Sequence, residues 1–132
     1  MKSKLQLSLL ITILLMTAAS SSHAQNKSES KKALRHVVMI KFKDSATPEN
    51  IKQVETHFAS LAGKIKLIKD FEWGKNSSPE NLNQGLTHCF IATFTSNEDR
   101  DAYLVHPEHK IFVEKEGPFF DKVTVVDYWT EK

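Results

Sequence analysis

The ten residues LRHVVMIKFK, from Leu34 to Lys43, decide which kind of fold the chain can form. Apolar residues recur at every second position along part of this stretch, a period typical of a β-strand with one buried face. The face predicted to meet a core has one histidine among apolar side chains and consists of His36, Val38, Ile40 and Phe42. The opposite face is half apolar and consists of Val37, Met39, Lys41 and Lys43. We therefore expect a sheet that buries one face and leaves the other partly apolar.

The rest of the chain predicts two helices, the second of them in two pieces, and three strands. Thr47 followed by Pro48 indicates a helix start, and apolar residues then recur at helical spacing as far as Gly63. A second helix is expected after the capping residue Ser96, with a further helical piece from Pro107. Strands are expected over residues 67–73, 86–95 and 123–129. This βαββαβ order predicts a ferredoxin-like α+β subunit, a four-stranded antiparallel-type sheet with helices on one face and with the first and third strands as central, parallel neighbours.

The open face of that sheet predicts a partner. Its central apolar residues are Val37, Met39, Cys89 and Ile91. An apolar patch of this kind usually marks an association surface. A second subunit laid sheet to sheet would cover it, so we expect a homodimer that forms an α/β barrel. The alternative is that the lysines and threonine of the same face keep it polar enough to remain in water.

Residues 1–24 have the three parts of a secretory signal peptide: a start with two lysines, an apolar run and a small-residue end. The apolar run is shorter than the ~20 residues that a membrane-spanning helix needs. We expect cleavage before Gln25, a flexible polar leader over residues 25–33 and one domain over residues 34–130. The predicted location is secreted or periplasmic, without stable membrane insertion.

Composition excludes several classes of function. The chain has 132 residues, with 18 Lys and Arg against 16 Asp and Glu, and two of the lysines lie within residues 1–24. A mature chain with equal numbers of basic and acidic residues lacks the excess positive charge that is typical of nucleic-acid-binding proteins. The single cysteine, Cys89, excludes an internal disulfide and a multi-cysteine zinc site. The sequence has no phosphate-binding loop and no GxGxxG, HExxH or GxSxG motif.

Histidines are the remaining candidates for chemistry. His36 and His88 lie on the core side of the first and third strands, so parallel strands would bring both imidazoles to one end of the sheet. His109, from the helical segment that should cover that end, and Tyr103 would complete a small-molecule pocket. We expect His36, His88 and Phe90 to contact the ligand in this pocket. Three imidazoles can bind zinc, but their spacing does not favour it, so we expect no metal and no cofactor.

Several short segments occur together in a characteristic order. They are Arg35-His36-Val37-Val38, Phe71-Glu72-Trp73-Gly74, Gln84-Gly85-Leu86-Thr87-His88, Tyr103-Leu104-Val105-His106-Pro107-Glu108-His109 and Val126-Asp127-Tyr128. Together they look like the stress-responsive A/B barrel (Dabb) domain family, over about Leu34 to Tyr128. The resemblance implies a ferredoxin-like subunit whose sheets pair into a dimeric α/β barrel.

The resemblance also implies a function, because the family includes a plant polyketide cyclase as well as members without known catalysis. His109 would remove a proton next to a carbonyl, and the Tyr103 hydroxyl would stabilise the oxyanion. His36 and His88 would orient substrate or water. We expect an exported, stress-related homodimer that binds a small apolar carbonyl or phenolic ligand. A cofactor-free lyase, cyclase or monooxygenase is the first alternative, and a structural scaffold without ligand is the second.

Overall fold

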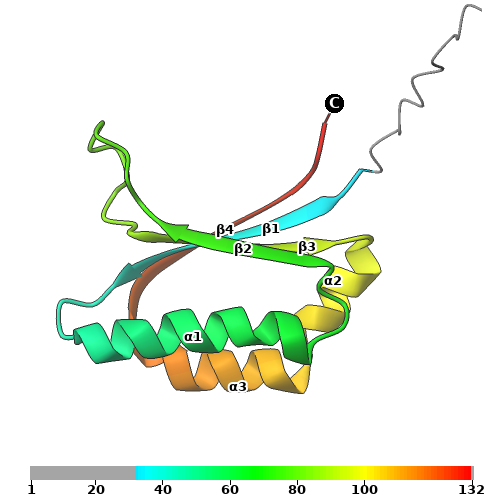
Figure 1. Cartoon of the computed structure of the whole chain (residues 1–132), viewed down its shortest axis with the longest axis horizontal. Helices are drawn as coiled ribbons and strands as arrows, with labels where there is room; N and C mark the ends of the chain where they lie inside the picture. The colour runs from blue at the N-terminus through cyan, green and yellow to red at the C-terminus, as the bar shows by residue number, and fades with distance from the viewer. Residues whose placement is uncertain (1–31, 132) are drawn as a thin grey trace, which may run out of the picture.

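Figure 1 shows the computed structural model, in which a four-stranded sheet lies over a layer of helices; residues 32–131 are described. The strands are β1 (Leu34–Phe42), β2 (Asp70–Lys75), β3 (His88–Phe94) and β4 (Phe120–Trp129). The helices are α1 (Pro48–Lys64), α2 (Asn97–Leu104) and α3 (Pro107–Glu116), followed by a short 3-10 turn, Gly117–Phe119. The predicted signal peptide and the first seven residues of the leader lie outside the described residues. Within residues 32–131, no helix is both long and apolar enough to cross a bilayer.

The strand order is β2-β3-β1-β4, and every neighbouring pair is antiparallel. This confirms the ferredoxin-like sheet but corrects one prediction, because β1 and β3 are central neighbours that run in opposite directions. A helix connects β1 to β2, and these strands run the same way, whereas β3 follows β2 through a loop and lies between them. The register places His36 opposite Ala92 and His88 opposite Ile40, so the two imidazoles occupy different positions along the strands.

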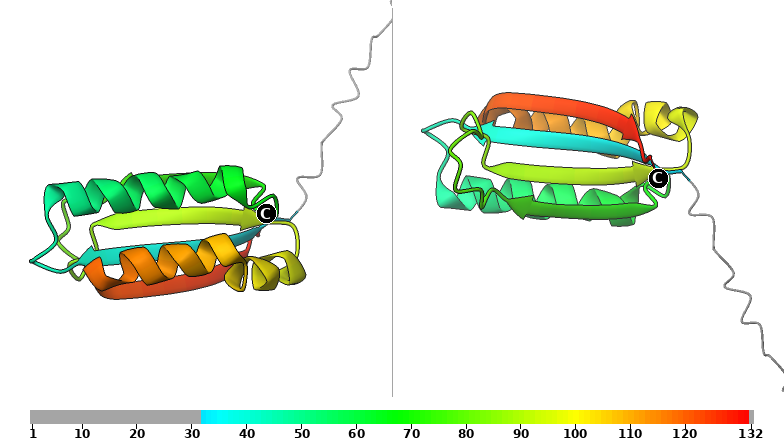
Figure 2. Two further views of the ribbon diagram at one scale, coloured as in Figure 1. Left: turned by 90° about the horizontal axis from the view of Figure 1, so that it is seen from below. Right: turned by 90° about the horizontal axis from the view of Figure 1, so that it is seen from above.

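All the helices lie on one face of the sheet, and the core lies between the two layers (Figure 2). Along β1, side chains alternate between buried and half-buried, as the period of two predicts. The Thr47 hydroxyl accepts a hydrogen bond from the Asn50 N–H (3.2 Å), and the Asn50 side chain accepts one from the Thr47 N–H (3.1 Å), which starts α1. The helix passes the predicted stop at Gly63 by one residue.

Within residues 32–131, no helix or strand covers the face of the sheet away from the helices (Figure 1). Its central residues Val37, Met39 and Ile91 are half-buried. On β4, Val126 and Tyr128 are each 47% exposed. A face with this much apolar surface is typical of an association surface.

Gly85, in the loop between β2 and β3, adopts the left-handed conformation with φ +77°, and a Cβ there would lie 2.9 Å from Lys41 Cδ. Gly85→Ala is therefore expected to lower the free energy of unfolding by about 1–2 kcal/mol. The matched control is Gly63→Ala in α1, where a Cβ meets nothing within 4 Å. It should raise stability by about 0.5–1 kcal/mol. Urea unfolding at one protein concentration compares the two variants. Changes of the same sign in their free energies of unfolding would contradict the prediction.

Candidate functional site

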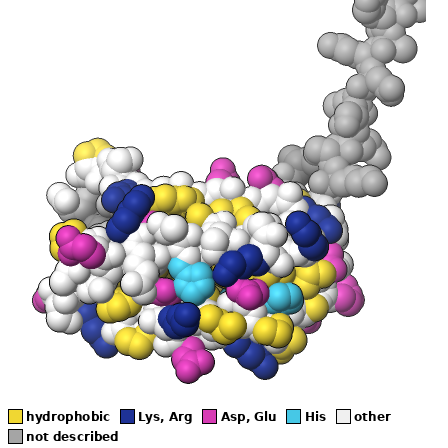
Figure 3. Space-filling view, turned by 60° about the horizontal axis from the view of Figure 1, so that its bottom comes forward, with side chains coloured by type: hydrophobic (Ala, Val, Ile, Leu, Met, Phe, Trp, Pro, Cys, Tyr) yellow, Lys and Arg dark blue, Asp and Glu magenta, His cyan; other side chains and the backbone are white. Residues whose placement is uncertain are grey.

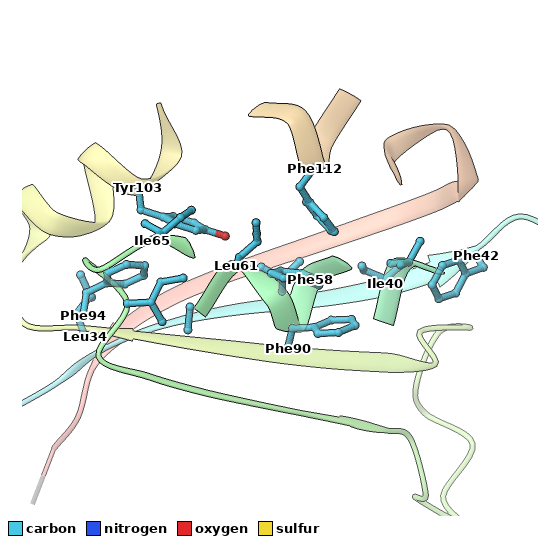
Figure 4. Close-up of a cluster of buried hydrophobic side chains, with 14 residues drawn as sticks. Leu34, Ile40, Phe42, Phe58, Leu61, Ile65, Phe90, Phe94, Tyr103 and Phe112 are labelled. Atoms are coloured by element: carbon cyan, nitrogen blue, oxygen red, sulfur yellow. The ribbon is translucent and has the colours of Figure 1, made fainter. Parts of the chain in front are cut away.

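Tyr103 and His109 form a close pair where α2 meets α3. The Tyr103 ring is fully buried, and its centroid lies 4.4 Å from that of His109. In Figure 4 the Tyr103 hydroxyl points into the core, toward Leu61. Within residues 32–131, this hydroxyl is a buried polar group without a hydrogen-bond partner. Burial raises the pKa of Tyr103, so the phenol stays protonated at neutral pH and keeps an unused donor.

His109 is held so that one ring nitrogen is free. Pro107 begins α3, and the His106 side chain caps it by accepting from the Glu108 N–H (3.2 Å). His109 then lies in the first turn, where its Nδ1–H donates to the Leu104 carbonyl (3.0 Å). The neutral ring therefore has its lone pair on Nε2. Burial lowers the pKa of His109, more than the bond to Leu104 raises it, and nearby His36 and His106 lower it further.

A series of hydrogen-bonded polar side chains lies on the sheet side of the Tyr103–His109 pair. His36, on the buried face of β1, lies with its ring centroid 5.7 Å from that of Tyr103. Its Nδ1 shares a hydrogen bond of 2.7 Å with Oδ1 of Asp127, the residue opposite it on β4. Oδ2 of Asp127 accepts a further hydrogen bond from Arg100 of α2. His36, Tyr103 and His109 thus come together as expected, with Asp127 and Arg100 behind them.

Asp127 and Arg100 were not among the predicted site residues. A signal for Asp127 existed, because alternation along the last strand places it on the same face as Val123 and Val125. One acid on an otherwise apolar face indicates a buried partner. No comparable signal marks Arg100, which lies in a short polar helix.

The expectation that His88 shares an end of the sheet with His36 is wrong, because β3 runs antiparallel to β1. His88 forms a separate cluster in which its Nε2 lies 3.2 Å from Oε1 of Glu55 and its Nδ1 lies 2.8 Å from the Thr87 hydroxyl. Its ring stacks on Trp73 at 6.4 Å. Any contact of His88 with a ligand stays a prediction.

Phe90 lies on the strand between the positions of the two histidine clusters. It is fully buried and stacks on Phe58, with ring centroids 4.3 Å apart. Phe112 packs on the other side of the same group, 4.5 Å from Phe58 (Figure 4). These three rings form an aromatic layer across the core. Phe90 is thus a core residue, and its predicted contact with ligand is untested.

Comparison with known proteins places this chain in a family. The sequence model of the Stress Responsive A/B Barrel Domain (Dabb) matches residues 34–130. This chain belongs to the Dabb family. The stress-response A/B barrel domain-containing protein HS1 of Arabidopsis thaliana is 42% identical to this Dabb chain over 100 residues, which cover 76% of this chain and 92% of that protein. Olivetolic acid cyclase of Cannabis sativa is 32% identical over 100 residues, which cover 76% of this chain and 99% of the cyclase.

Among solved structures, a dimeric ferredoxin-like protein from Jannaschia sp. CCS1 is similar, with a TM-score of 0.64 and 26% identity. The alignment covers 73% of this chain and 97% of that protein. The predicted family and the predicted ferredoxin-like subunit are both confirmed.

The Dabb chain holds a third histidine–carboxylate pair in its helix layer. Nδ1 of His57 in α1 lies 2.7 Å from Oε1 of Glu116 at the end of α3, and the Gln53 amide donates to both Glu116 oxygens (3.2 and 3.0 Å). Figure 3 shows histidine side chains among lysines and acids on this surface. The Glu116 side chain is only 1% exposed, so the pair joins α1 to α3 as a buried polar contact.

The hollows found on this Dabb chain lie away from the Tyr103–His109 pair. One, of about 590 Å³, lies below the loop between β2 and β3, and Met39, Leu82, Leu86 and Cys89 supply its apolar lining. Another, of about 630 Å³, lies beside His57 and Glu116. Within residues 32–131, no three His, Cys, Asp or Glu side chains are arranged to hold a metal ion.

Proposed function

We propose that this Dabb protein is a homodimer that binds a small, largely apolar carbonyl or phenolic compound at the Tyr103 hydroxyl. The observation that carries the proposal is the buried O–H without a partner. Leaving such a group unpaired costs about 1–3 kcal/mol, and a carbonyl or phenolic oxygen would supply the missing acceptor. The neighbouring side chains, Phe94 and the His36 and His109 rings, suit a flat apolar compound with one polar edge.

The homodimer is supported by two observations. The face of the sheet away from the helices carries half-exposed apolar side chains, and the similar protein from Jannaschia is described as dimeric. Two such faces packed together would form an α/β barrel. Export, to the periplasm or the medium, is a further part of the proposal and depends on residues 1–24 alone. A role in stress response is supported by the description of the family.

Acid–base catalysis is the second candidate, and the geometry of His109 favours it. With Nδ1–H bonded to Leu104 and the ring neutral, Nε2 can take a proton from the carbon next to a carbonyl. The Tyr103 O–H would then donate to the carbonyl oxygen as negative charge develops there. The proton on Nε2 would return to carbon or to a leaving group. The relative that is an olivetolic acid cyclase supports this lyase or cyclase alternative.

Tyr103→Phe tests the binding proposal with para-hydroxyacetophenone, which offers both a carbonyl and a phenol. Titration calorimetry should show affinity weakened about tenfold, the value of one hydrogen bond, while urea unfolding shows stability unchanged or slightly raised. Tyr128→Phe, at the other tyrosine, is the matched control and should leave affinity unchanged. Equal affinity in Tyr103→Phe and the wild-type protein would contradict the proposal.

Native mass spectrometry of the purified protein separates the three functions. A retained small molecule, with no change in it over time, supports a binding protein. Turnover of that molecule, lost in His109→Gln, supports the enzyme. A protein that retains nothing and does not bind the probe supports the scaffold.

A further inference from the structure

Helix α2 carries Tyr103, whose ring points into the core (Figure 4), and has few ties to the sheet. It is eight residues long, and Tyr103 is its one buried residue. Among the described residues 32–131, Arg100–Asp127 is the only side-chain hydrogen bond or ion pair between α2 and the strands. At the other end of α2, the Leu104 carbonyl accepts from His109. The helix is therefore held to the sheet by one buried ring and one charged contact.

The Arg100–Asp127 contact is partly shielded from water. The side chains are 19% and 26% exposed, less than in a typical surface ion pair, which contributes little. Hydrogen bonds in which both groups are charged are among the stronger ones. Arg100 also contacts Asp101 (2.7 Å) within α2, which holds the guanidinium on the helix.

The Asp127 carboxylate also contacts a residue of the candidate site, His36. Asp127 Oδ1 pairs with Nδ1 of His36, while Oδ2 pairs with Arg100. Release of Arg100 would leave the Asp127 carboxylate free to turn, and the orientation of His36 depends on that carboxylate. Movement of α2 and the position of His36 are thereby linked through one residue.

A ligand cannot reach the Tyr103 hydroxyl while α2 stays in this position, since the Tyr103 residue is 0% exposed. Buried sites of this kind are reached by local opening of a segment with few contacts. We propose that Arg100 is a gating and positioning residue: its bond to Asp127 holds α2 and the Tyr103 ring against the sheet and fixes His36, and its release lets a ligand reach the Tyr103 hydroxyl. The inference rests on the proposed binding site, yet it concerns the free protein and is tested without any ligand.

Nitration by tetranitromethane measures the opening, because the chain has only two tyrosines. Tyr103 is buried, whereas Tyr128 lies on the open face of the sheet, away from α2, and serves as an internal control whose rate should not differ between wild type and Arg100→Met. Loss of a charge-assisted hydrogen bond in Arg100→Met should raise the nitration rate of Tyr103 at least about tenfold, with the rate of Tyr128 unchanged. Arg100→Lys, which keeps the charge, should give a smaller increase. Peptide mass spectrometry reads both tyrosines in one sample.

Arg35→Met is the matched control, because Arg35 contacts Asp70 and Thr93 on the open face of the sheet and not α2. It should leave Tyr103 nitration unchanged. Urea unfolding of each variant shows whether the opening is local. The gate would be overturned if the nitration rate of Tyr103 did not rise in Arg100→Met. It would also be overturned if that rate rose only by the factor that the loss of global stability predicts. Failure of the probe to bind, with the nitration pattern as expected, would instead contradict the proposed function alone.

Discussion

Met39→Asp is expected to convert the proposed homodimer into a monomer. Met39 lies near the middle of the open face, opposite Cys89 on β3 and Thr124 on β4. In a sheet-to-sheet dimer, each subunit would bury a carboxylate, and neither residue directly opposite it, Cys89 or Thr124, carries a positive charge. The desolvation penalty of an unpaired buried charge is several kcal/mol per ion, enough to dissociate a moderate dimer. Light scattering coupled to size exclusion measures the mass directly.

Val113→Asp is the matched control for Met39→Asp. Val113 is 51% exposed and lies on α3, on the opposite side of the molecule from the open face. The same change in chemistry there should leave a dimer. A Met39→Asp protein with the mass of the wild type, or a Val113→Asp protein that becomes monomeric, would refute association through the open face.

Glu116→Ala should produce the largest loss of stability among single changes outside the aromatic core. It removes a buried carboxylate and leaves the His57 Nδ1 and the Gln53 amide without their partner between α1 and α3. Leaving such buried donors without their partner lowers the free energy of unfolding by about 1–3 kcal/mol. Urea denaturation, monitored by circular dichroism at one protein concentration, gives this difference.

Glu114→Ala supplies the comparison, since Glu114 is exposed on the same helix. It should change stability by less than about 0.5 kcal/mol. The double change His57→Phe with Glu116→Leu replaces both polar partners by apolar ones. It should recover much of the loss, because well-packed apolar side chains can replace a buried polar pair. A loss in Glu116→Ala no larger than that in Glu114→Ala would show that the pair does not join the helices.

The alternation in β1 was sufficient to predict the buried and open faces of the sheet, because the period of two is a local property. The direction of β3 relative to β1 was not, because alternation is the same in either direction along a strand. Only the path of the connections determines that direction, and the error separated His88 from the other histidines. His88 instead contacts Glu55, which is 33 positions away in the chain.

Tyr103 and His109 were easier to place, because six positions and one helix break at Pro107 separate them. A short, local segment limits where two side chains can lie. The pairing of His36 with Asp127 depends instead on the register between β1 and β4, which joins residues 91 positions apart. Pattern analysis of one strand contains no information on that register. Long-range partners such as Asp127 and Arg100 therefore required the three-dimensional structure.

The double use of Asp127 has an evolutionary consequence. A mutation at position 127 would leave both the Arg100 guanidinium and the His36 imidazole without their partner. A single substitution therefore disrupts two contacts at once. Substitutions at positions 36, 100 and 127 should therefore be inherited as a group. In relatives without an arginine at position 100, another contact should hold α2 to the sheet. Asp127 is expected to change only after that contact is present.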